Sequence, residues 1–120
     1  CAKEIKPWLP ISENYTYCNV QTAQNDEDSL LNFYKKIIHF RNITAAIKFG
    51  KLEIAEKYCS KEVLAFYRIL EEKTFLILLN MSEKKIPLPE IKGKNCLSTY
   101  PVIAEDNTLK AWEGRIVEME

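Results

Sequence analysis

The single histidine, His39, is the only imidazole that could serve as the base of a Ser/His or Cys/His nucleophile pair. It lies in a stretch of helical periodicity among charged residues, and no glycine-tight turn that could present a nucleophile is near it. We therefore expect His39 to be a helix-surface residue and predict no nucleophilic triad.

The glycines give no sign of nucleotide chemistry. Gly50, Gly93 and Gly114 are the only three in the chain, and none belongs to a GxGxxG or P-loop pattern. The sequence therefore predicts no backbone cradle for a phosphate.

Glu113, within "KAWEGRIVEME", is the carboxylate whose neighbours suggest general acid catalysis. It follows Trp112, and a carboxyl group held against an aromatic ring can act as a general acid. Glycoside hydrolysis needs a second carboxylate placed with the first, and no recognisable motif supplies one. A lone glutamate on an alternating strand is usually solvated, so we expect an exposed Glu113 and assign no catalytic residue.

Four cysteines are widely and irregularly spaced, at Cys1, Cys18, Cys59 and Cys96. They form no CxxC pattern, and one histidine cannot complete a Cys/His zinc set, so we predict no metal and no cofactor. We favour buried or idle thiols over two disulfides, since the chain is not cysteine-dense like a small secreted scaffold. We expect a cytoplasmic protein; Asn-x-Ser/Thr sequences at Asn14, Asn42 and Asn80 keep secretion as the alternative.

Composition narrows the class of protein further. Apolar residues make up 47% and charged residues 28%, which are ordinary globular values. Seventeen basic residues balance 17 acidic ones, which argues against nucleic acid or a membrane surface as a partner. The longest apolar run, Phe75 to Leu79, is too short to span a bilayer. Because the chain begins at Cys1 without an initiator methionine, we interpret it as a fragment rather than as a lipidated N-terminus.

The element that carries His39 is the clearest helix in the sequence. Acidic residues precede Ser29, which favours a helix N-terminus with Asp28 or Ser29 as the cap. Apolar residues then recur at helical spacing, which predicts a helix over about Ser29–Arg41. Before it, Cys1 to about Gln24 reads as an extended loop.

From Gly50 onward the period alternates, as in strands. "EVLAFYRIL" and "TFLILLNMS" flank a polar turn and predict a hairpin whose second strand is central. Two prolines confine "KKIPLPE" to a sheet edge. In the last strand Glu113 and Arg115 share one face. We predict a mainly β fold, an antiparallel sandwich of Greek-key type preceded by an irregular loop and one helix, with strands over 51–58, 62–70, 74–82, 84–90, 95–101 and 110–120.

The N-terminal stretch "KPWLPISENYTYCNVQTAQNDEDSLLNFYKKIIHFRN" resembles the end of the catalytic barrel in alpha-glucosidases of the alpha-amylase superfamily, glycoside hydrolase family 13. Members show a Lys/Arg-Pro-Trp-Leu-Pro loop ending in Asn-Tyr, and then a helix containing Leu-Asn-Tyr/Phe-Tyr. The matching positions here are Lys6, Pro7, Trp8, Leu9, Pro10, Asn14, Tyr15, Asn19, Val20, Gln24, Ser29, Leu30, Leu31, Asn32, Phe33, Tyr34, Lys35, Lys36 and Arg41.

The rest of the chain is also similar to that family. "GKLEIAEKYCSKEVLAFYR" resembles the strand that leads into Val-Phe-Ala-Tyr-x-Arg, "FLILLNMSEKKIPLP" resembles Val-Val-Leu-Asn-Phe-Ser, and "LKAWEGRIVEM" resembles the closing Trp/Tyr-Glu-Ala-Arg-Val-Tyr. Two departures stand out: the helix lacks the usual proline after its end, and Gly114 stands where alanine is usual.

The resemblance implies that residues 1–44 are the last loop and helix of a (β/α)8 barrel and 45–120 an antiparallel C-terminal domain. The family's catalytic carboxylates would lie on the missing barrel, which would be the partner of this segment. The parent enzyme would act on alpha-glucoside oligosaccharides. Trp8 and Tyr15 are weak candidates for substrate binding, with interdomain packing as the favoured role. We expect Cys1 to about Tyr17 to be poorly packed and a compact core from Ser29 onward.

Two alternatives stay open at this point. One is a free carbohydrate-binding module that stacks sugars on Trp8, Tyr15, Tyr100 and Trp112. The other is the extracellular domain of a transporter heavy subunit, a catalytically silent relative of the same fold.

Overall fold

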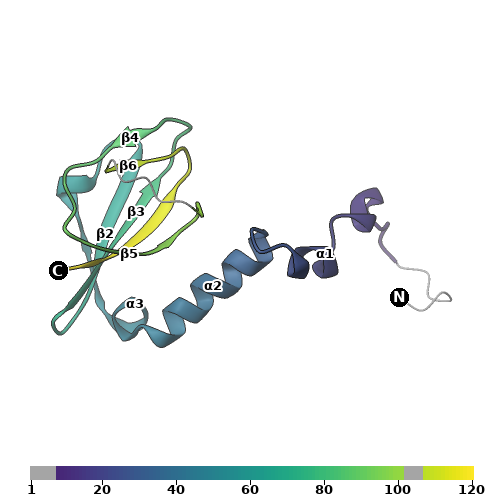
Figure 1. Cartoon of the computed structure of the whole chain (residues 1–120), viewed down its shortest axis with the longest axis horizontal. Coiled ribbons are helices and arrows are strands. Elements are labelled where there is room, and N and C mark those ends of the chain that lie inside the picture. Colours follow the sequence, from purple (N-terminus) through teal and green to yellow (C-terminus); the bar gives the residue numbers. More distant parts are fainter. Residues whose placement is uncertain (1–7, 102–106) are drawn as a thin grey trace. The chain divides into compact units, whose positions relative to one another are not determined.

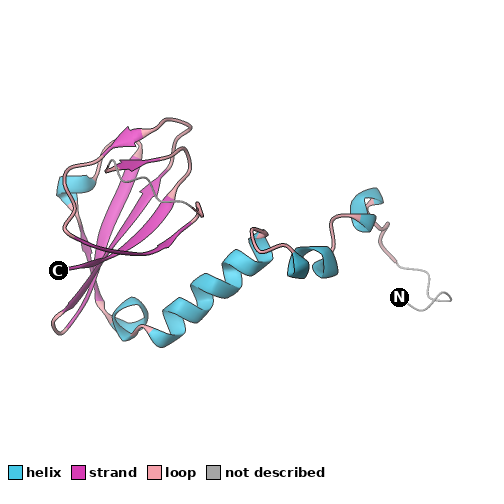
Figure 2. Ribbon diagram, viewed as in Figure 1, coloured by secondary structure: helices cyan, strands magenta, loops and turns pink. Residues whose placement is uncertain are grey.

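The computed structural model describes residues 8–101 and 107–120 (Figure 1). It falls into two compact units, one that ends at Lys35 and one that runs from Lys36 to Glu120. Along the chain the longer helices come first and the strands follow (Figure 2). The domain boundary expected between residues 44 and 45 stays a prediction.

The N-terminal unit contains two short helical segments where the sequence suggests only an extended loop. A 3-10 turn, η1, spans Glu13–Thr16, and a short helix, α1, spans Val20–Asn25. The cause is Asn19, whose side-chain oxygen accepts a hydrogen bond from the backbone N–H of Thr22 at 2.9 Å and caps α1. The prediction of an extended loop is therefore wrong for these segments, and its first seven residues lie outside the described part of the chain.

The predicted helix is present as α2, which spans Leu30–Ile43. Ser29 is its N-cap, as expected, since its hydroxyl accepts from the backbone N–H of Asn32 at 3.2 Å. The side-chain amide of Asn32 in turn donates at 3.1, 3.1 and 2.8 Å to the carbonyl groups of Ala23, Gln24 and Asp26. These bonds tie the start of α2 to the end of α1. The compact core expected from Ser29 onward is wrong for Ser29–Lys35, which belong to the N-terminal unit.

The second unit is built on an antiparallel five-stranded sheet, which confirms the predicted mainly β, sandwich-like fold. Its order is β1-β2-β3-β7-β5, and a two-stranded ladder of β4 and β6 forms a second, small sheet. The strands are β1 (Lys51–Ile54), β2 (Val63–Leu70), β3 (Lys73–Asn80), β4 (Ile86–Pro87), β5 (Gly93–Ser98), β6 (Thr108–Leu109) and β7 (Gly114–Met119).

Side chains of the central strands alternate between two cores. On one face Leu76 and Leu78 of β3 join Val117 of β7 and Leu109 of the small sheet in the larger core. On the other face Phe75, Ile77 and Ile116 pack with Ala46 in a smaller core. The predicted burial of β3 on both faces is therefore confirmed. Leu109 of the small sheet packs on one face, and Ala46 packs on the other.

Several strand boundaries differ from the predicted ones; the strand expected over 95–101, for example, spans Gly93–Ser98 as β5. The strand expected over 51–58 stops at Ile54, because Glu56–Tyr58 forms a 3-10 turn, η2, that carries Tyr58 into the core. The strand expected over 110–120 begins only at Gly114, because Trp112 adopts a φ of 56°, which a strand does not accommodate. The edge strand expected over 84–90 shrinks to two residues, and the sequence did not reveal their partner β6.

A third helix, α3 (Ala45–Phe49), leads into β1 and was not predicted. Its end requires Gly50, because a Cβ atom there would lie 2.8 Å from the carbonyl oxygen of Ile69 on β2 and would also collide with the carbonyl oxygen of Ala46. Glycine thus lets the chain leave α3 in close contact with the sheet.

Candidate functional site

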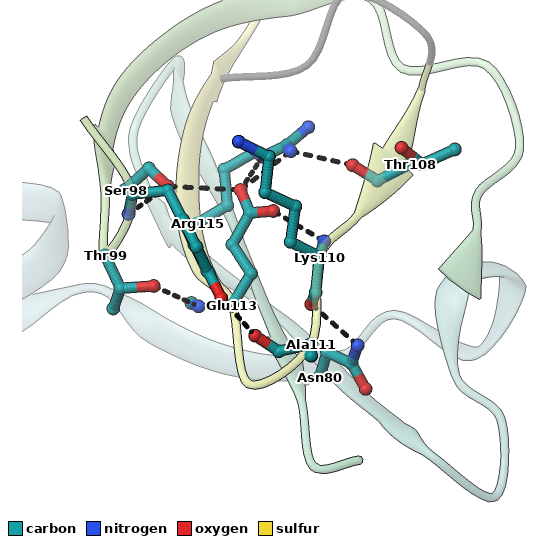
Figure 3. A network of polar contacts seen from close by, with 10 residues as sticks. Asn80, Ser98, Thr99, Thr108, Lys110, Ala111, Glu113 and Arg115 are labelled. Atoms are coloured by element: carbon teal, nitrogen blue, oxygen red, sulfur yellow. Dashed lines mark hydrogen bonds and ion pairs between the residues drawn. The ribbon is translucent and has the colours of Figure 1, made fainter. Parts of the chain in front are cut away.

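Glu113 is buried, not exposed as the sequence suggested. Its residue is 1% exposed, and its carboxylate accepts from Arg115, from Nε at 2.9 Å and from Nη2 at 2.7 Å (Figure 3). The Ser98 hydroxyl donates to the same oxygen at 3.1 Å, and the backbone N–H of Lys110 donates to the other at 2.7 Å. The expectation of a solvated glutamate fails because the following strand places a buried arginine on the same face.

The geometry gives this ion pair a structural role. Arg115 also donates from Nη2 to the carbonyl group of Thr108 at 2.8 Å, so the pair joins β5, β6 and β7 (Figure 3). The carboxylate has four hydrogen bonds and no open side, and among the described residues Glu113 is the only buried carboxylate. A retaining glycosidase uses two carboxylates about 5–5.5 Å apart around the scissile bond, and the described part of the chain holds no such buried pair.

Asn80 forms a second polar junction that sequence reasoning missed. Its side-chain nitrogen donates to the carbonyl groups of Lys84 at 2.7 Å and Lys110 at 2.8 Å. Its oxygen accepts from the backbone N–H and hydroxyl of Ser82, at 3.0 and 2.8 Å. Because the residue is only 2% exposed and both amide hydrogens are engaged, its Asn-x-Ser pattern reflects a turn and not an accessible glycan acceptor. The signal in the sequence was an Asn-x-Ser turn directly after a strand.

The candidate sugar-binding aromatics are divided between the two units, and their role in substrate binding stays a prediction. Trp8 is 91% exposed and Tyr15 is 60% exposed, both in the N-terminal unit. The exposure of Trp8 agrees with the expectation that this loop is poorly packed. In the second unit the Tyr100 hydroxyl donates to the carbonyl group of Ala111 at 2.8 Å, and its ring lies under the Lys110 ammonium at 4.9 Å. One face of Tyr100 is therefore already occupied.

Among the described residues, Tyr67 and Lys51 have shifted pKa values, and both make structural contacts. Burial, with a smaller contribution from Tyr58, raises the pKa of the Tyr67 hydroxyl, so Tyr67 stays neutral at physiological pH. The hydrogen bond that the exposed Lys51 ammonium donates to Glu53, together with the charge of that carboxylate, raises the pKa of Lys51. Neither shift moves a group toward the neutral range that an acid or base catalyst requires.

The most conspicuous surface feature is apolar. On α2 the side chains of Leu30, Tyr34 and Ile38 are 72%, 57% and 54% exposed, and their spacing of four residues places them along one face of the helix. No residue of α2 is buried. An apolar helix face of this kind is the face that packs against a neighbour in a folded domain. We call these three residues the α2 stripe.

Two hollows lie beside the last turns of α2, within the second unit. The larger, of about 680 Å³, is bordered by Ile43, Ala46, Phe75 and Glu118. The smaller, of about 330 Å³, lies between Phe40 and the sheet residues Phe66, Arg68, Ile77 and Ile116. Phe40 borders both and packs edge-on against Phe75, with the ring centroids 6.0 Å apart.

Metal and membrane sites receive no support from the residues that the structure describes. Over 8–101 and 107–120 no group of three or more His, Cys, Asp or Glu side chains could hold a metal ion. No helix in that part of the chain combines the length and apolarity that crossing a bilayer requires.

Comparisons with known proteins find a matching family and similar enzymes. The profile of the family described as "Alpha amylase, catalytic domain" matches residues 2–50. An oligo-1,6-glucosidase of Parageobacillus thermoglucosidasius is 28% identical over 123 residues, which cover 94% of this chain and 22% of that enzyme. An oligo-1,6-glucosidase of Saccharomyces cerevisiae is 31% identical over 120 residues, 92% of this chain and 20% of that enzyme.

Comparison with solved structures points to related enzymes. The crystal structure of isomaltulose synthase from Klebsiella sp. LX3 superposes with a TM-score of 0.82 at 26% identity, over 96% of this chain and 22% of that one. The homologues and structural neighbours of this chain are thus enzymes of the alpha-amylase family, glycoside hydrolase family 13, and the chain corresponds to a segment of them. Oligo-1,6-glucosidases are its homologues, and it spans 22% of the length of the Parageobacillus relative.

Proposed function

We propose that the chain is the C-terminal, non-catalytic portion of an alpha-glucosidase-type glycoside hydrolase. The parent enzyme acts on short alpha-1,4- or alpha-1,6-linked glucosides by a retaining mechanism, in the cytoplasm. Its catalytic carboxylates lie on the barrel, which is the partner of this segment. The chain itself is structural: residues 1–44 complete the barrel, and residues 45–120 form the domain that covers it.

The observation that carries this proposal is the contrast between the two parts of the chain. The part matched by the catalytic-domain profile leaves the α2 stripe and Trp8 in solvent. The part beyond residue 50 buries its own core around Leu76, Leu78 and Val117. Large apolar side chains on a regular helix face, without cover, are expected where a neighbouring domain is missing.

Hydrolysis of an aryl alpha-glucoside tests the non-catalytic role. The isolated chain should release no more aryl alcohol than buffer does, because its one buried carboxylate among the described residues is closed by four hydrogen bonds. Robust turnover by the isolated chain would refute the assignment.

A graft tests the structural role. In it, this chain replaces the matching stretch of the Parageobacillus oligo-1,6-glucosidase, to which it aligns over 94% of its length. The graft should fold and hydrolyse isomaltose, whereas the same enzyme truncated at that stretch should be insoluble or inactive. A truncated enzyme as active as the graft would remove the structural role.

A second candidate function is a carbohydrate-binding module, favoured by the exposure of Trp8 at 91% and Trp112 at 63%. Stacking of a sugar on either indole would change its fluorescence. Titration with maltotriose to about 10 mM, a range that weak sites reach, should leave the emission unchanged if the structural role is right. A saturable change that Trp112→Ala abolishes would favour the binding module.

A further inference from the structure

The smaller hollow holds two cationic side chains in an apolar setting. Arg68 on β2 and Arg41 in the last turn of α2 both border it, and its other lining residues are apolar. None of the lining residues is acidic, and no ion pair joins either arginine to a carboxylate among the described residues. Two arginines thus border a hollow of about 330 Å³ whose lining residues include no counter-charge.

Arg68 has an unmet hydrogen-bonding demand. Its Nη2 donates to the carbonyl group of Lys48 at 3.4 Å, a long bond, and its Nε is buried with no partner among the described residues. A guanidinium presents five N–H donors in a fixed fork, so one long bond leaves most of its capacity unused. Buried donors in folded proteins are nearly always paired, so this one indicates an acceptor that the described residues do not supply.

Arg41 by itself does not indicate a missing hydrogen-bond acceptor. A cation in the last turn of a helix is favourable because of the helix dipole, and the residue is exposed. Arg68 has no such explanation, since it lies on a strand between Phe66 and Leu70, which pack against the smaller core. The two arginines together nevertheless define the charge that an occupant must carry.

We propose that this hollow is the seat of an aspartate or glutamate side chain of the catalytic barrel, with Arg68 as its inner anchor and Arg41 as its outer one. The proposal rests on the proposed function, because the occupant belongs to the missing barrel. A carboxylate matches the fork of a guanidinium, and the bond is charge-assisted and gains strength in apolar surroundings. The apolar walls formed by Phe40, Ile77 and Ile116 fit the aliphatic stem of a protein side chain better than a hydrated inorganic anion.

Hexanoate serves as the probe, because it joins a carboxylate to an aliphatic stem. Titrated into the isotope-labelled chain at constant ionic strength, it should shift the Arg68 Nε–H resonance saturably, with half-saturation in the millimolar range. Hexanol and hexylammonium, of the same length, should not shift it. Equal shifts by hexanoate and hexanol, or no shift by about 100 mM hexanoate, would overturn the proposal.

Variants distinguish a specific role of Arg68 in carboxylate binding from a general effect of positive charge. Arg68→Gln should weaken the hexanoate response, followed at the Phe66 and Ile77 resonances, at least tenfold, and Arg68→Lys should weaken it less. The matched control is Lys61→Gln, which removes an exposed cation outside the hollow and should leave the response unchanged. An amide spectrum of each variant reports whether it folds; if Arg68→Gln does not, the comparison of hexanoate with hexanol on the unaltered chain decides.

The graft distinguishes a barrel carboxylate from a small-molecule ligand. Arg68→Gln should lower the thermal midpoint of the graft by several degrees more than it lowers that of the isolated chain, and Lys61→Gln should change neither. Equal effects on graft and chain would overturn docking of the barrel even if hexanoate binds. Turnover of the aryl glucoside by the isolated chain would refute the proposed function without altering the hexanoate result, so the two failures are distinguishable.

Discussion

Glu113 and Arg115 stand only two positions apart, yet their side chains form a closely matched two-bond ion pair, 0% and 3% exposed. The pair lies where the chain enters β7, just after Trp112, which has a φ of 56°. The carboxylate then reaches along the same face as the guanidinium. A glutamate that the sequence suggested to be solvated is in fact the centre of a polar junction.

Removal of the carboxylate should be among the most destabilising single changes in this chain. Glu113→Ala leaves Arg115 buried without a counter-charge, and breaking a buried pair in this way costs about 3–5 kcal/mol of unfolding free energy. Urea unfolding of the isolated chain measures it. Glu83→Gln, at an exposed position, is the matched control and should change the unfolding free energy by less than about 0.5 kcal/mol. A small effect of Glu113→Ala would mean that the junction is not closed in solution.

Replacement of Gly50 and of Gly114 by alanine should have opposite effects on the unfolding free energy. Gly50→Ala drives a methyl group into the carbonyl oxygens of Ala46 and Ile69, both rigid backbone atoms, and should cost about 1–3 kcal/mol. Gly114→Ala meets only side-chain atoms, the nearest being Leu79 Cδ2 at 3.3 Å, and should be neutral or stabilise by up to about 1 kcal/mol. Chemical denaturation of both variants side by side checks the contrast. Similar losses in the two would show that backbone contact at Gly50 is not the cause.

The α2 stripe should matter to the whole enzyme and not to the isolated chain. Replacing Leu30, Tyr34 and Ile38 by glutamine removes apolar surface that is already in water, so the thermal midpoint of the isolated chain should move by no more than about 2–4 °C. In the graft the same triple change should abolish activity or solubility. Lys35→Gln, on the same helix, is the control and should leave the graft active. An active triple variant would remove the stripe from the proposed interface.

High pH should weaken the fold through Tyr67. Burial raises its pKa above the ordinary value of 10.0, so the folded state retains the proton more strongly than the unfolded state does. The resulting stabilisation is fully present below the unfolded pKa and is lost as the pH rises through the folded pKa. Unfolding free energies at pH 8 and pH 11 should therefore differ more for the unaltered chain than for Tyr67→Phe. Identical pH dependence in the two proteins would contradict the assignment.

Much of the fold could be predicted from the sequence because helix caps and strand alternation are local patterns. Ser29 caps α2 as expected, and the alternation of β2 and β3 around a polar turn gives the observed hairpin. The same alternation placed Glu113 and Arg115 on one face, although it could not show that this face is buried. Burial depends on Leu109 and the small sheet that cover it, and these come from distant parts of the chain.

The features of the fold that could not be predicted from the sequence depend on single residues with an unusual conformation or capping role. Trp112 in a left-handed conformation ends one predicted strand, and such a conformation is rare for a bulky side chain. Asn19 starts a helix in a stretch that has no helical period. The family resemblance identified the chain, whereas the two arginines of the smaller hollow emerged only once α2 and the sheet were placed together.

β1 is one of the two edge strands of the five-stranded sheet, and β5 is the other. Lys51 and Glu53 stand on β1 as an ion pair of 2.7 Å, both in solvent. Charged side chains along an edge disfavour the addition of another strand. Addition of a strand from another copy of the isolated chain is therefore disfavoured at β1.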